Sequence, residues 1–236
     1  MLLFANSVHS ERLPIKSYTT TDGLPRDYIG RIMQDSKGFL WFCTIEGLSR
    51  FDGYQFKNYG IDQGLPSRYV NDFLETRSGV YWVATNEGVC RFDPDPSQSD
   101  GVAEAKKRFV VCTTKDRRDP GVNVLLEDRR GVVWCGTNAG LCRLEEVDRD
   151  WVLSPTDIIP ANEGVLAIVE DRQGSLWVLS GLAVYRQRPD GVVERYAEAE
   201  GVPFASRFQA MIADRGEGRE AGGGEAGRRQ ASRQAG

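Results

Sequence analysis

The sequence predicts an all-β fold: an incomplete β-propeller of four-stranded antiparallel blades, with about four blades and the start of a fifth. Three observations predict it. A tryptophan-centred segment occurs four times in the 236 residues, the middle strand of each copy is apolar at nearly every position, and turn residues separate the apolar runs. Because a lone meander cannot bury both faces, such sheets must stack around an axis.

The four copies align on one pattern of residues. They run from Ile29 to Asp52, Val70 to Asp93, Val122 to Leu144 and Val165 to Arg186. Their tryptophans are Trp41, Trp82, Trp134 and Trp177. The spacings of 41, 52 and 43 residues are close to the length of a four-stranded blade.

Each copy carries turn and packing residues at equivalent positions, and we expect them to serve the scaffold. They are Asp35, Gly38, Trp41, Gly79, Trp82, Asp128, Gly131, Trp134, Asp171, Gly174 and Trp177. An aspartate can cap the turn and a glycine can take positive φ. The tryptophans are expected to pack between blades, and stacking on a ligand is the alternative. In the second copy Thr76 replaces the aspartate.

The blades are predicted near residues 29–59, 70–111, 122–154 and 165–196, with a partial blade at 202–214, inside a repeat region of 11–214. Residues 1–10 are interpreted as a signal-peptide remnant or a frayed N-terminus. Residues 215–236 hold Gly, Arg, Ala and Glu but no larger apolar side chain, so this tail is predicted to be disordered. The abrupt change after Asp214 indicates a truncated or frameshifted reading frame.

Two further expectations concern the edges of the pattern. The fourth copy is interpreted as two residues shorter after its middle strand, with Val184 at the position of Arg50, which would shorten that blade on one face. The segment Leu13 to Tyr18 matches an outer strand and would close the last blade of a complete ring. Since unpaired edge strands promote association, a marginal monomer or a self-associating chain is expected.

Composition excludes several classes of function. A net charge of −4 argues against nucleic acid as a partner, because phosphate binding needs a surplus of Lys and Arg. His9 is the single histidine, so a histidine metal site or base is not expected, and we expect no metal and no cofactor. The five cysteines lack a C-x-x-C pair and are interpreted as buried core residues, with a disulfide left open. No apolar run is long enough for a membrane span.

One face of the propeller would collect the loops before each inner strand and the turns between second and third strands. The candidate ligand-binding residues there are Arg26, Asp27, Tyr28, Glu46, Arg68, Tyr69, Asn86, Glu87, Asn138 and Arg207. Charged, aromatic and amide side chains together can hold an oligosaccharide or another polar small ligand. Solvated loop residues are the alternative. The repeated Arg50, Arg91 and Arg143 are expected to pair with turn carboxylates such as Asp35 or Asp128.

The pattern D-x-x-G-x-x-W-x-x-T-x-x-G-L-x-R-F is carried by Asp35, Gly38, Trp41, Thr44, Gly47, Leu48, Arg50 and Phe51. In this pattern, and in the T-x-x-D-G-L-P lead-in at residues 19–25, the chain resembles the two-component regulator propeller repeat family. The resemblance implies an extracytoplasmic, periplasmic sensor region of bacterial hybrid histidine kinases and related regulators. Propellers of that family typically have seven blades, followed by a β-sandwich, a membrane helix and an output module.

The favoured function is therefore a noncatalytic sensory propeller, the input region and a fragment of a two-component signalling protein. A scaffold propeller that binds a protein partner or another copy of itself is the first alternative. An enzymatic propeller is the second, because Glu46 and Glu87 occupy matching loop positions and could act as a carboxylate pair in a lyase or glycan-cleaving enzyme.

Overall fold

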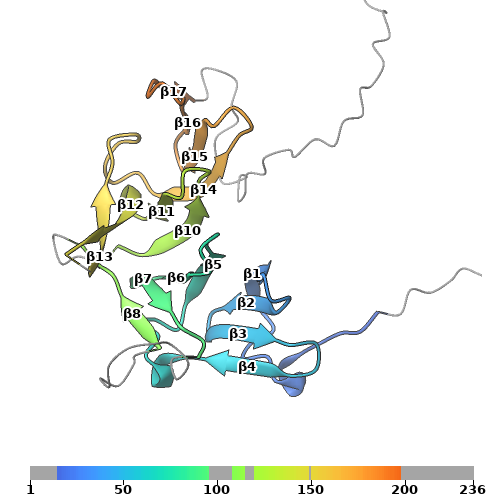
Figure 1. The fold of residues 1–236 in the computed structure, drawn as a ribbon. Helices are drawn as coiled ribbons and strands as arrows, with labels where there is room; N and C mark the ends of the chain where they lie inside the picture. The colour runs from blue at the N-terminus through green and yellow to red at the C-terminus, as the bar shows by residue number, and fades with distance from the viewer. Residues whose placement is uncertain (1–14, 96–107, 115–119, 149, 198–236) are drawn as a thin grey trace, which may run out of the picture.

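A computed structural model describes residues 15–95, 108–114, 120–148 and 150–197. In these residues four antiparallel sheets follow one another along the chain and fan out in an open arc (Figure 1). The predicted all-β architecture of four-stranded blades is confirmed. The expected partial blade at 202–214, the tail at 215–236 and Arg207 lie outside the described residues.

Each blade is a meander in which successive strands pair. Blade 1 contains β1 (Ile29–Gln34), β2 (Leu40–Thr44), β3 (Gly47–Phe51) and β4 (Phe56–Tyr59). Blade 2 contains β5 (Val70–Glu75), β6 (Tyr81–Thr85), β7 (Gly88–Phe92) and β8 (Phe109–Val111). Blade 3 contains β10 (Val122–Glu127), β11 (Val133–Thr137), β12 (Gly140–Val147) and β13 (Asp150–Pro155). Blade 4 contains β14 (Val165–Glu170), β15 (Leu176–Ser180), β16 (Val184–Gln187) and β17 (Val193–Tyr196).

Three short elements lie outside the meanders. The 3-10 turns η1 (Thr20–Asp22) and η2 (Ile61–Gln63) precede blades 1 and 2 at equivalent positions of the repeat. The two-residue strand β9 (Thr113–Thr114) pairs in parallel with β13, so the third sheet has five strands and not the expected four. This extra strand belongs to the connection between blades 2 and 3, residues 112–121.

The cores lie between blades, which is why both faces of the middle strands are apolar. Trp41 packs against Phe73 of the next blade, with ring centroids 4.7 Å apart, in a cluster shared by blades 1 and 2. Trp82 and Trp134 occupy the corresponding clusters between blades 2 and 3 and between blades 3 and 4. The expectation that these tryptophans pack between blades is confirmed. All five cysteines are buried, as expected of core residues.

The repeated aspartate and tryptophan form one hydrogen-bonded unit. Asp35 Oδ1 accepts from the backbone N–H groups of Lys37 and Phe39, and its Oδ2 accepts from Trp41 Nε1 at 2.8 Å. The same bond joins Trp134 Nε1 to Asp128 at 3.0 Å and Trp177 Nε1 to Asp171 at 2.8 Å. The carboxylate therefore closes the first hairpin and also holds the indole that fills the space between blades.

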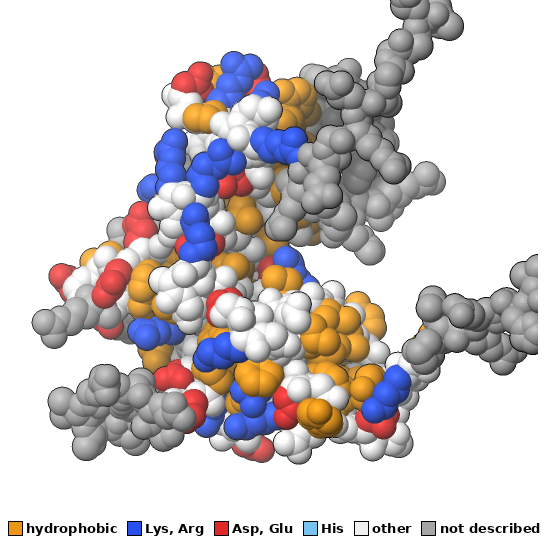
Figure 2. Space-filling view, turned by 45° about the vertical axis from the view of Figure 1, so that its right-hand side comes forward, with side chains coloured by type: hydrophobic (Ala, Val, Ile, Leu, Met, Phe, Trp, Pro, Cys, Tyr) orange, Lys and Arg blue, Asp and Glu red, His pale blue; other side chains and the backbone are white. Residues whose placement is uncertain are grey.

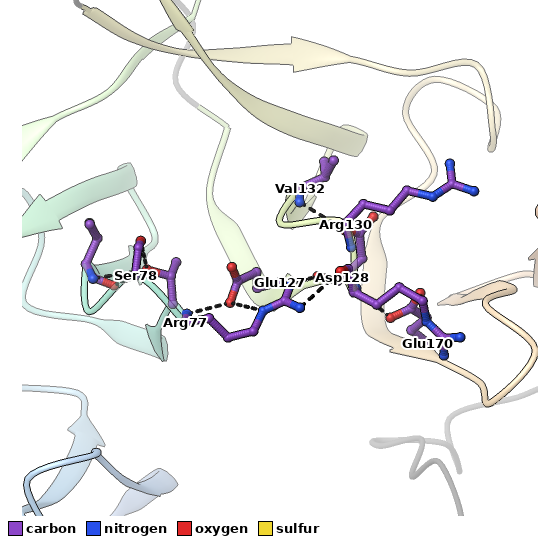
Figure 3. A network of polar contacts seen from close by, with 10 residues as sticks. Arg77, Ser78, Glu127, Asp128, Arg130, Val132 and Glu170 are labelled. Carbon is purple, nitrogen blue, oxygen red and sulfur yellow. Dashed lines mark hydrogen bonds and ion pairs between the residues drawn. The ribbon is translucent and has the colours of Figure 1, made fainter.

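A second repeated contact joins each blade to the next one. Arg129 at the tip of the first hairpin of blade 3 pairs with Glu170, the last residue of β14, at 2.8 Å, and donates to the carbonyl of Arg172 at 3.0 Å. Arg77 makes the equivalent ion pair with Glu127 at 3.3 Å (Figure 3). Because each arginine also satisfies backbone carbonyls of the next hairpin, the contact sets the spacing of neighbouring blades.

The fourth copy is not shortened, so that prediction is wrong. The Ser180 hydroxyl donates to the carbonyl of Ala183 at 3.0 Å, as the Thr44 hydroxyl donates to Gly47 at 2.8 Å. Consequently Arg186, and not Val184, stands opposite Trp177. The turn keeps its four residues and only its residue types differ, with serine and alanine in place of threonine and glycine.

The repeated arginines do not pair with turn carboxylates as expected. The Arg50 guanidinium lies 4.3 Å from the ring centroid of Phe39, and Arg143 pairs with Glu145 at 3.4 Å. At these repeat positions of the described chain, a turn aspartate is reached by Arg186, whose guanidinium lies 3.7 Å from Asp171. The neighbouring side chain therefore sets the partner of each arginine: the Phe39 ring for Arg50 and the Glu145 carboxylate for Arg143 take the place of the turn aspartate.

The expected strand at Leu13 to Tyr18 is absent over its described part, 15–18. A strand needs a hydrogen-bonded neighbour, and none of the described residues pairs with this segment. Tyr18 nevertheless packs on blade 1, with its ring 4.9 Å from Phe51, as Tyr59 packs 5.0 Å from Phe92 of blade 2. Hydrophobic side chains gather on blade 1 next to this segment (Figure 2).

Candidate functional site

The two faces of the blade array differ in their polar chemistry. The asparagine face, as we name it, holds the loops 23–28 and 64–69 before β1 and β5 and the turns that contain Glu46, Asn86 and Asn138. The aspartate face holds the first-hairpin turns that contain Asp35, Asp128 and Asp171. The two sets of turns lie at opposite ends of the antiparallel strands. The predicted candidate residues that the structure describes belong to the asparagine face.

The structure brings four of the predicted residues together between blades 1 and 2. Glu46 Oε1 lies 3.6 Å from Arg26 Nη2 and 3.6 Å from Arg68 Nη1. Arg68 also lies over the ring of Tyr69 at 5.0 Å and donates to its hydroxyl at 3.2 Å. We name Arg26, Glu46, Arg68 and Tyr69 the arginine cluster.

The arginine cluster is open to solvent and carries excess positive charge. The side chains of Arg26 and Arg68 are 57% and 55% exposed, and that of Glu46 is 33% exposed. Two guanidinium groups share one carboxylate oxygen at distances too long for strong hydrogen bonds. An anionic group can therefore approach either arginine without displacing a tight ion pair.

Asp27 and Tyr28 lie on the same loop as Arg26 but are not part of the arginine cluster. Asp27 Oδ1 accepts from the backbone N–H of Thr20 at 2.9 Å, so its carboxylate holds the turn η1. Tyr28 is 68% exposed. Its phenol is available as a stacking surface next to the cluster.

Asn86 and Asn138 serve the scaffold of this face. Each accepts a hydrogen bond through its side-chain oxygen from an inner-strand asparagine of its own blade, Asn71 for Asn86 and Asn123 for Asn138, both at 2.9 Å. Asn71 also donates to the carbonyl of Val122 in the next blade at 2.8 Å. Asn71 and Asn123 thus link consecutive blades, and each also holds the side-chain oxygen of the turn asparagine in its own blade.

Glu87 does not join the arginine cluster through any described ion pair. Its backbone N–H donates to the Thr85 hydroxyl at 3.1 Å, as the N–H of Glu46 donates to Thr44. Glu46 is engaged by two arginines, whereas no described residue makes an ion pair with Glu87. The two carboxylates therefore have different surroundings in spite of their matching positions.

Sequence reasoning missed an ion pair on the inner strands that joins a buried carboxylate to a half-exposed arginine. Asp72 of β5 is fully buried, and its Oδ2 accepts from Arg31 of β1 at 2.9 Å and from the backbone N–H of Leu125 of β10 at 2.8 Å. Burial raises the pKa of Asp72 to about 6, although Arg31 and the backbone donors lower it. The sequence carries one sign of this pair: Arg31 and Asp72, of opposite charge, occupy the same position of the repeat in two successive inner strands.

The described residues offer no cluster of three His, Cys, Asp or Glu side chains able to hold a metal ion. Nor does any helix in this part of the chain have the length and apolar character needed to cross a membrane.

Comparison with known proteins agrees with this architecture. No curated protein matches the chain. Residues 23–46 and 64–87 match the family described as two component regulator propeller. Each matched segment begins in a loop of the asparagine face and ends in the turn after the second strand of a blade.

Several solved structures share the fold at low sequence identity. The extracellular domain of a hybrid two component system from B. thetaiotaomicron is 22% identical, with a TM-score of 0.62, over 78% of this chain and 24% of that one. The extracellular domain of a one component system from the same organism is 17% identical, with a TM-score of 0.58, over 86% of this chain and 26% of that one.

Virginiamycin B lyase from Staphylococcus aureus also aligns, with 15% identity and a TM-score of 0.55, over 74% of this chain and 57% of that one. The chain thus spans about a quarter of the two B. thetaiotaomicron chains and just over half of the lyase. Residues 23–46 and 64–87 are therefore similar to two component regulator propeller repeats, and they lie in a propeller-like array of four blades.

Proposed function

We propose that this chain is a noncatalytic sensory propeller, the input region of a two-component signalling protein, and that it binds a polar anionic ligand such as an acidic oligosaccharide at the arginine cluster. The observation that carries the proposal is the loose sharing of Glu46 by Arg26 and Arg68. The similarity of the fold to extracellular domains of two component systems supports the signalling role and an extracytoplasmic location.

The chemistry of the arginine cluster favours an acidic sugar over a neutral one. Arginine binds a carboxylate in a two-pronged geometry, and the two guanidinium groups exceed the one carboxylate between them by one charge. Tyr69 and Tyr28 add phenol surfaces of the kind on which a sugar ring packs. A noncatalytic role is favoured because the Glu46 carboxylate faces two arginines, which suits it to shape a binding site for an anion.

The test is calorimetric titration with trigalacturonate and, for comparison, neutral maltotriose. Trigalacturonate should bind, and Arg68→Ala and Arg26→Ala should each weaken binding by about tenfold, since each removes one charged contact to a carboxylate. Arg91→Ala is the matched control, because Arg91 is exposed on β7 away from the cluster. Equal binding of trigalacturonate by wild type and Arg68→Ala, or slow cleavage of the sugar that Glu46→Gln abolishes, would contradict the proposal.

A further inference from the structure

The interface between blades 3 and 4 contains a cleft of about 150 Å³ on the aspartate face. Its lining includes Asp128, Arg130, Trp134, Leu176, Gln187 and Arg188. These residues come from the first hairpin of blade 3, from the second and third strands of blade 4, and from the position just after that third strand. The cleft lies on the opposite face from the arginine cluster and does not depend on it.

The equivalent position between blades 1 and 2 is filled by a phenol. Tyr81 precedes Trp82 as Leu176 precedes Trp177. The Tyr81 ring stacks on Phe73 at 5.4 Å and lies 5.8 Å from Trp41. Its hydroxyl donates to Asp35 Oδ2 at 3.1 Å, so one aspartate oxygen accepts from both the indole of its own blade and the phenol of the next.

Leu176 cannot reproduce that contact. It is shorter than tyrosine and has no hydroxyl, so Asp128 Oδ2 accepts from Trp134 Nε1 without a phenol beside it. Trp134 is 8% exposed, whereas Trp41 is 1% exposed. The aspartate oxygen and the indole edge that a tyrosine covers between blades 1 and 2 thus border the cleft between blades 3 and 4.

The cleft also holds a guanidinium group that has no described partner. Arg130 occupies the repeat position of Lys37, whose Nζ lies 6.0 Å from the Tyr81 ring centroid. Among the described residues no hydrogen bond or ion pair engages the Arg130 guanidinium, and its side chain extends away from the Arg77 and Glu127 pair (Figure 3). The carboxylate of Glu170 is held by Arg129, so it does not neutralise Arg130.

Arg188 adds a feature that the other blades lack. It follows the third strand of blade 4 at the position where the preceding blades carry an acidic residue, namely Asp52, Asp93 and Glu145. Its guanidinium pairs with Glu194, yet it remains part of the lining. The exchange of an acid for a base makes this interface more positive than its counterparts.

We propose that the cleft binds a monocyclic phenol that bears a carboxylate, a hydroxybenzoate-type ligand. Its hydroxyl donates to Asp128 Oδ2 as the Tyr81 hydroxyl donates to Asp35. Its ring packs between the Trp134 indole and Leu176. Its carboxylate meets Arg130. A volume of about 150 Å³ suits a single ring, since cavities of this size accept benzene.

The test is titration of the protein with 4-hydroxybenzoate, followed by the indole N–H resonance of Trp134 and by calorimetry. We expect one equivalent to bind with a dissociation constant below about 1 mM, as fits a ligand of this size. Benzoate, which lacks the hydroxyl, and phenol, which lacks the carboxylate, should each bind at least about fivefold more weakly.

Two variants separate the proposed site from nonspecific binding. Leu176→Tyr should fill the cleft with the phenol seen at Tyr81, abolish binding of 4-hydroxybenzoate and leave the protein folded by circular dichroism. Arg130→Ala should lower the affinity for 4-hydroxybenzoate and leave the affinity for phenol unchanged. Lys37→Ala, the equivalent change at the filled interface, should alter neither affinity.

The proposal is overturned if binding of 4-hydroxybenzoate does not saturate, or if folded Leu176→Tyr binds it as tightly as wild type. It is also overturned if galacturonate shifts the Trp134 indole resonance and 4-hydroxybenzoate does not. None of these outcomes affects the arginine cluster, which is tested by trigalacturonate and Arg68→Ala.

Discussion

Asp72 is the residue on which three blades converge. It accepts from Arg31 of blade 1, from its own neighbour Phe73 and from the backbone of Leu125 in blade 3. The inner strands each contain an irregularity at this level, between Val70 and Asp72 in β5. Such an irregularity turns a side chain out of the regular alternation. The Asp72 carboxylate of blade 2 therefore links blade 1 to blade 3, although no strand of one pairs with a strand of the other.

Asp72→Asn should change how stability depends on pH. Burial raises the pKa of Asp72 to about 6, above the value of about 3.9 of an unfolded aspartate, so the folded state binds this proton more tightly. The resulting stability is fully present below about pH 4 and is lost as pH rises through 6. Urea unfolding at pH 4, 5.5 and 7 should show that the stability of wild type relative to Asp72→Asn falls by about 2 to 3 kcal/mol over this range.

Asp62→Asn is the control, because it removes one carboxylate from the exposed turn η2, which precedes blade 2. A constant difference between wild type and Asp72→Asn across the three pH values would show that the folded protein does not hold this proton more tightly.

At the scale of elements, the first hairpin of each blade is the unit that sets the distance to the next blade. In blades 2, 3 and 4 the last residue of the inner strand, Glu75, Glu127 or Glu170, accepts from the hairpin of the preceding blade. In blade 1 the donor is Ser36, through its N–H and its hydroxyl at 2.6 Å each, and no arginine is needed. The hairpin tips therefore form a continuous polar seam along the aspartate face.

Arg129→Ala should loosen the seam between blades 3 and 4. The change removes an ion pair with Glu170 and donors to two backbone carbonyls, which we expect to lower the free energy of unfolding by about 1 kcal/mol, because the side chain is half-exposed and its charge is partly screened. Denaturant unfolding checks this value. Arg130→Ala, the next residue of the same turn, should cost less than about 0.5 kcal/mol. Identical midpoints for the two variants would contradict a role for Arg129 in blade spacing.

At the scale of the whole molecule, the described blades form an arc, and the face of blade 1 that points away from blade 2 carries apolar side chains (Figures 1 and 2). Ile32 on this face is 54% exposed, although the equivalent Phe73 of blade 2 is 2% exposed inside an interface. Tyr18 covers the part of the face near Phe51 and Phe56. The rest remains accessible to another apolar surface.

Ile32→Lys should therefore reduce self-association. Apolar faces of this kind promote contacts between copies, and a charge on the inner strand opposes them. Sedimentation velocity over a hundredfold range of concentration should show a wild-type coefficient that rises with concentration and a variant coefficient that rises less. Lys57→Ala, on the outer strand of the same blade, is the control. A wild type that stays monomeric throughout would remove the expectation of self-association.

Much of the fold could be predicted from local chemistry. The aspartate of the first hairpin, the tryptophan six residues later and the threonine of the second turn act within one blade, so their spacing is preserved in the chain. The fourth copy departs from the sequence pattern but not from the geometry, because Ser180 and Ala183 form the same turn as Thr44 and Gly47 with other residue types. The repeated arginine has a different partner in each blade because the neighbouring side chain differs. Arg50 lies over the Phe39 ring, Arg143 pairs with Glu145, and Arg186 reaches Asp171.

The candidate site was predictable in location more than in detail. Their loop positions place Arg26, Glu46 and Arg68 on one face. That both arginines reach the Glu46 carboxylate depends on how blades 1 and 2 are stacked. Asn86 and Asn138 were assigned to a ligand from their residue type, and the structure shows that inner-strand asparagines engage them.

The repeat, the all-β character and the composition of each blade are encoded locally, because hairpin turns and strand alternation act over a few residues. The stacking of the blades sets which side chains meet across them: Asp72 contacts Arg31 and Leu125, and Leu176 and Asp128 line one cleft. The physical reason is that contacts between blades depend on the stacking of whole sheets, and residues about 40 to 50 positions apart meet there without any local pattern that pairs them.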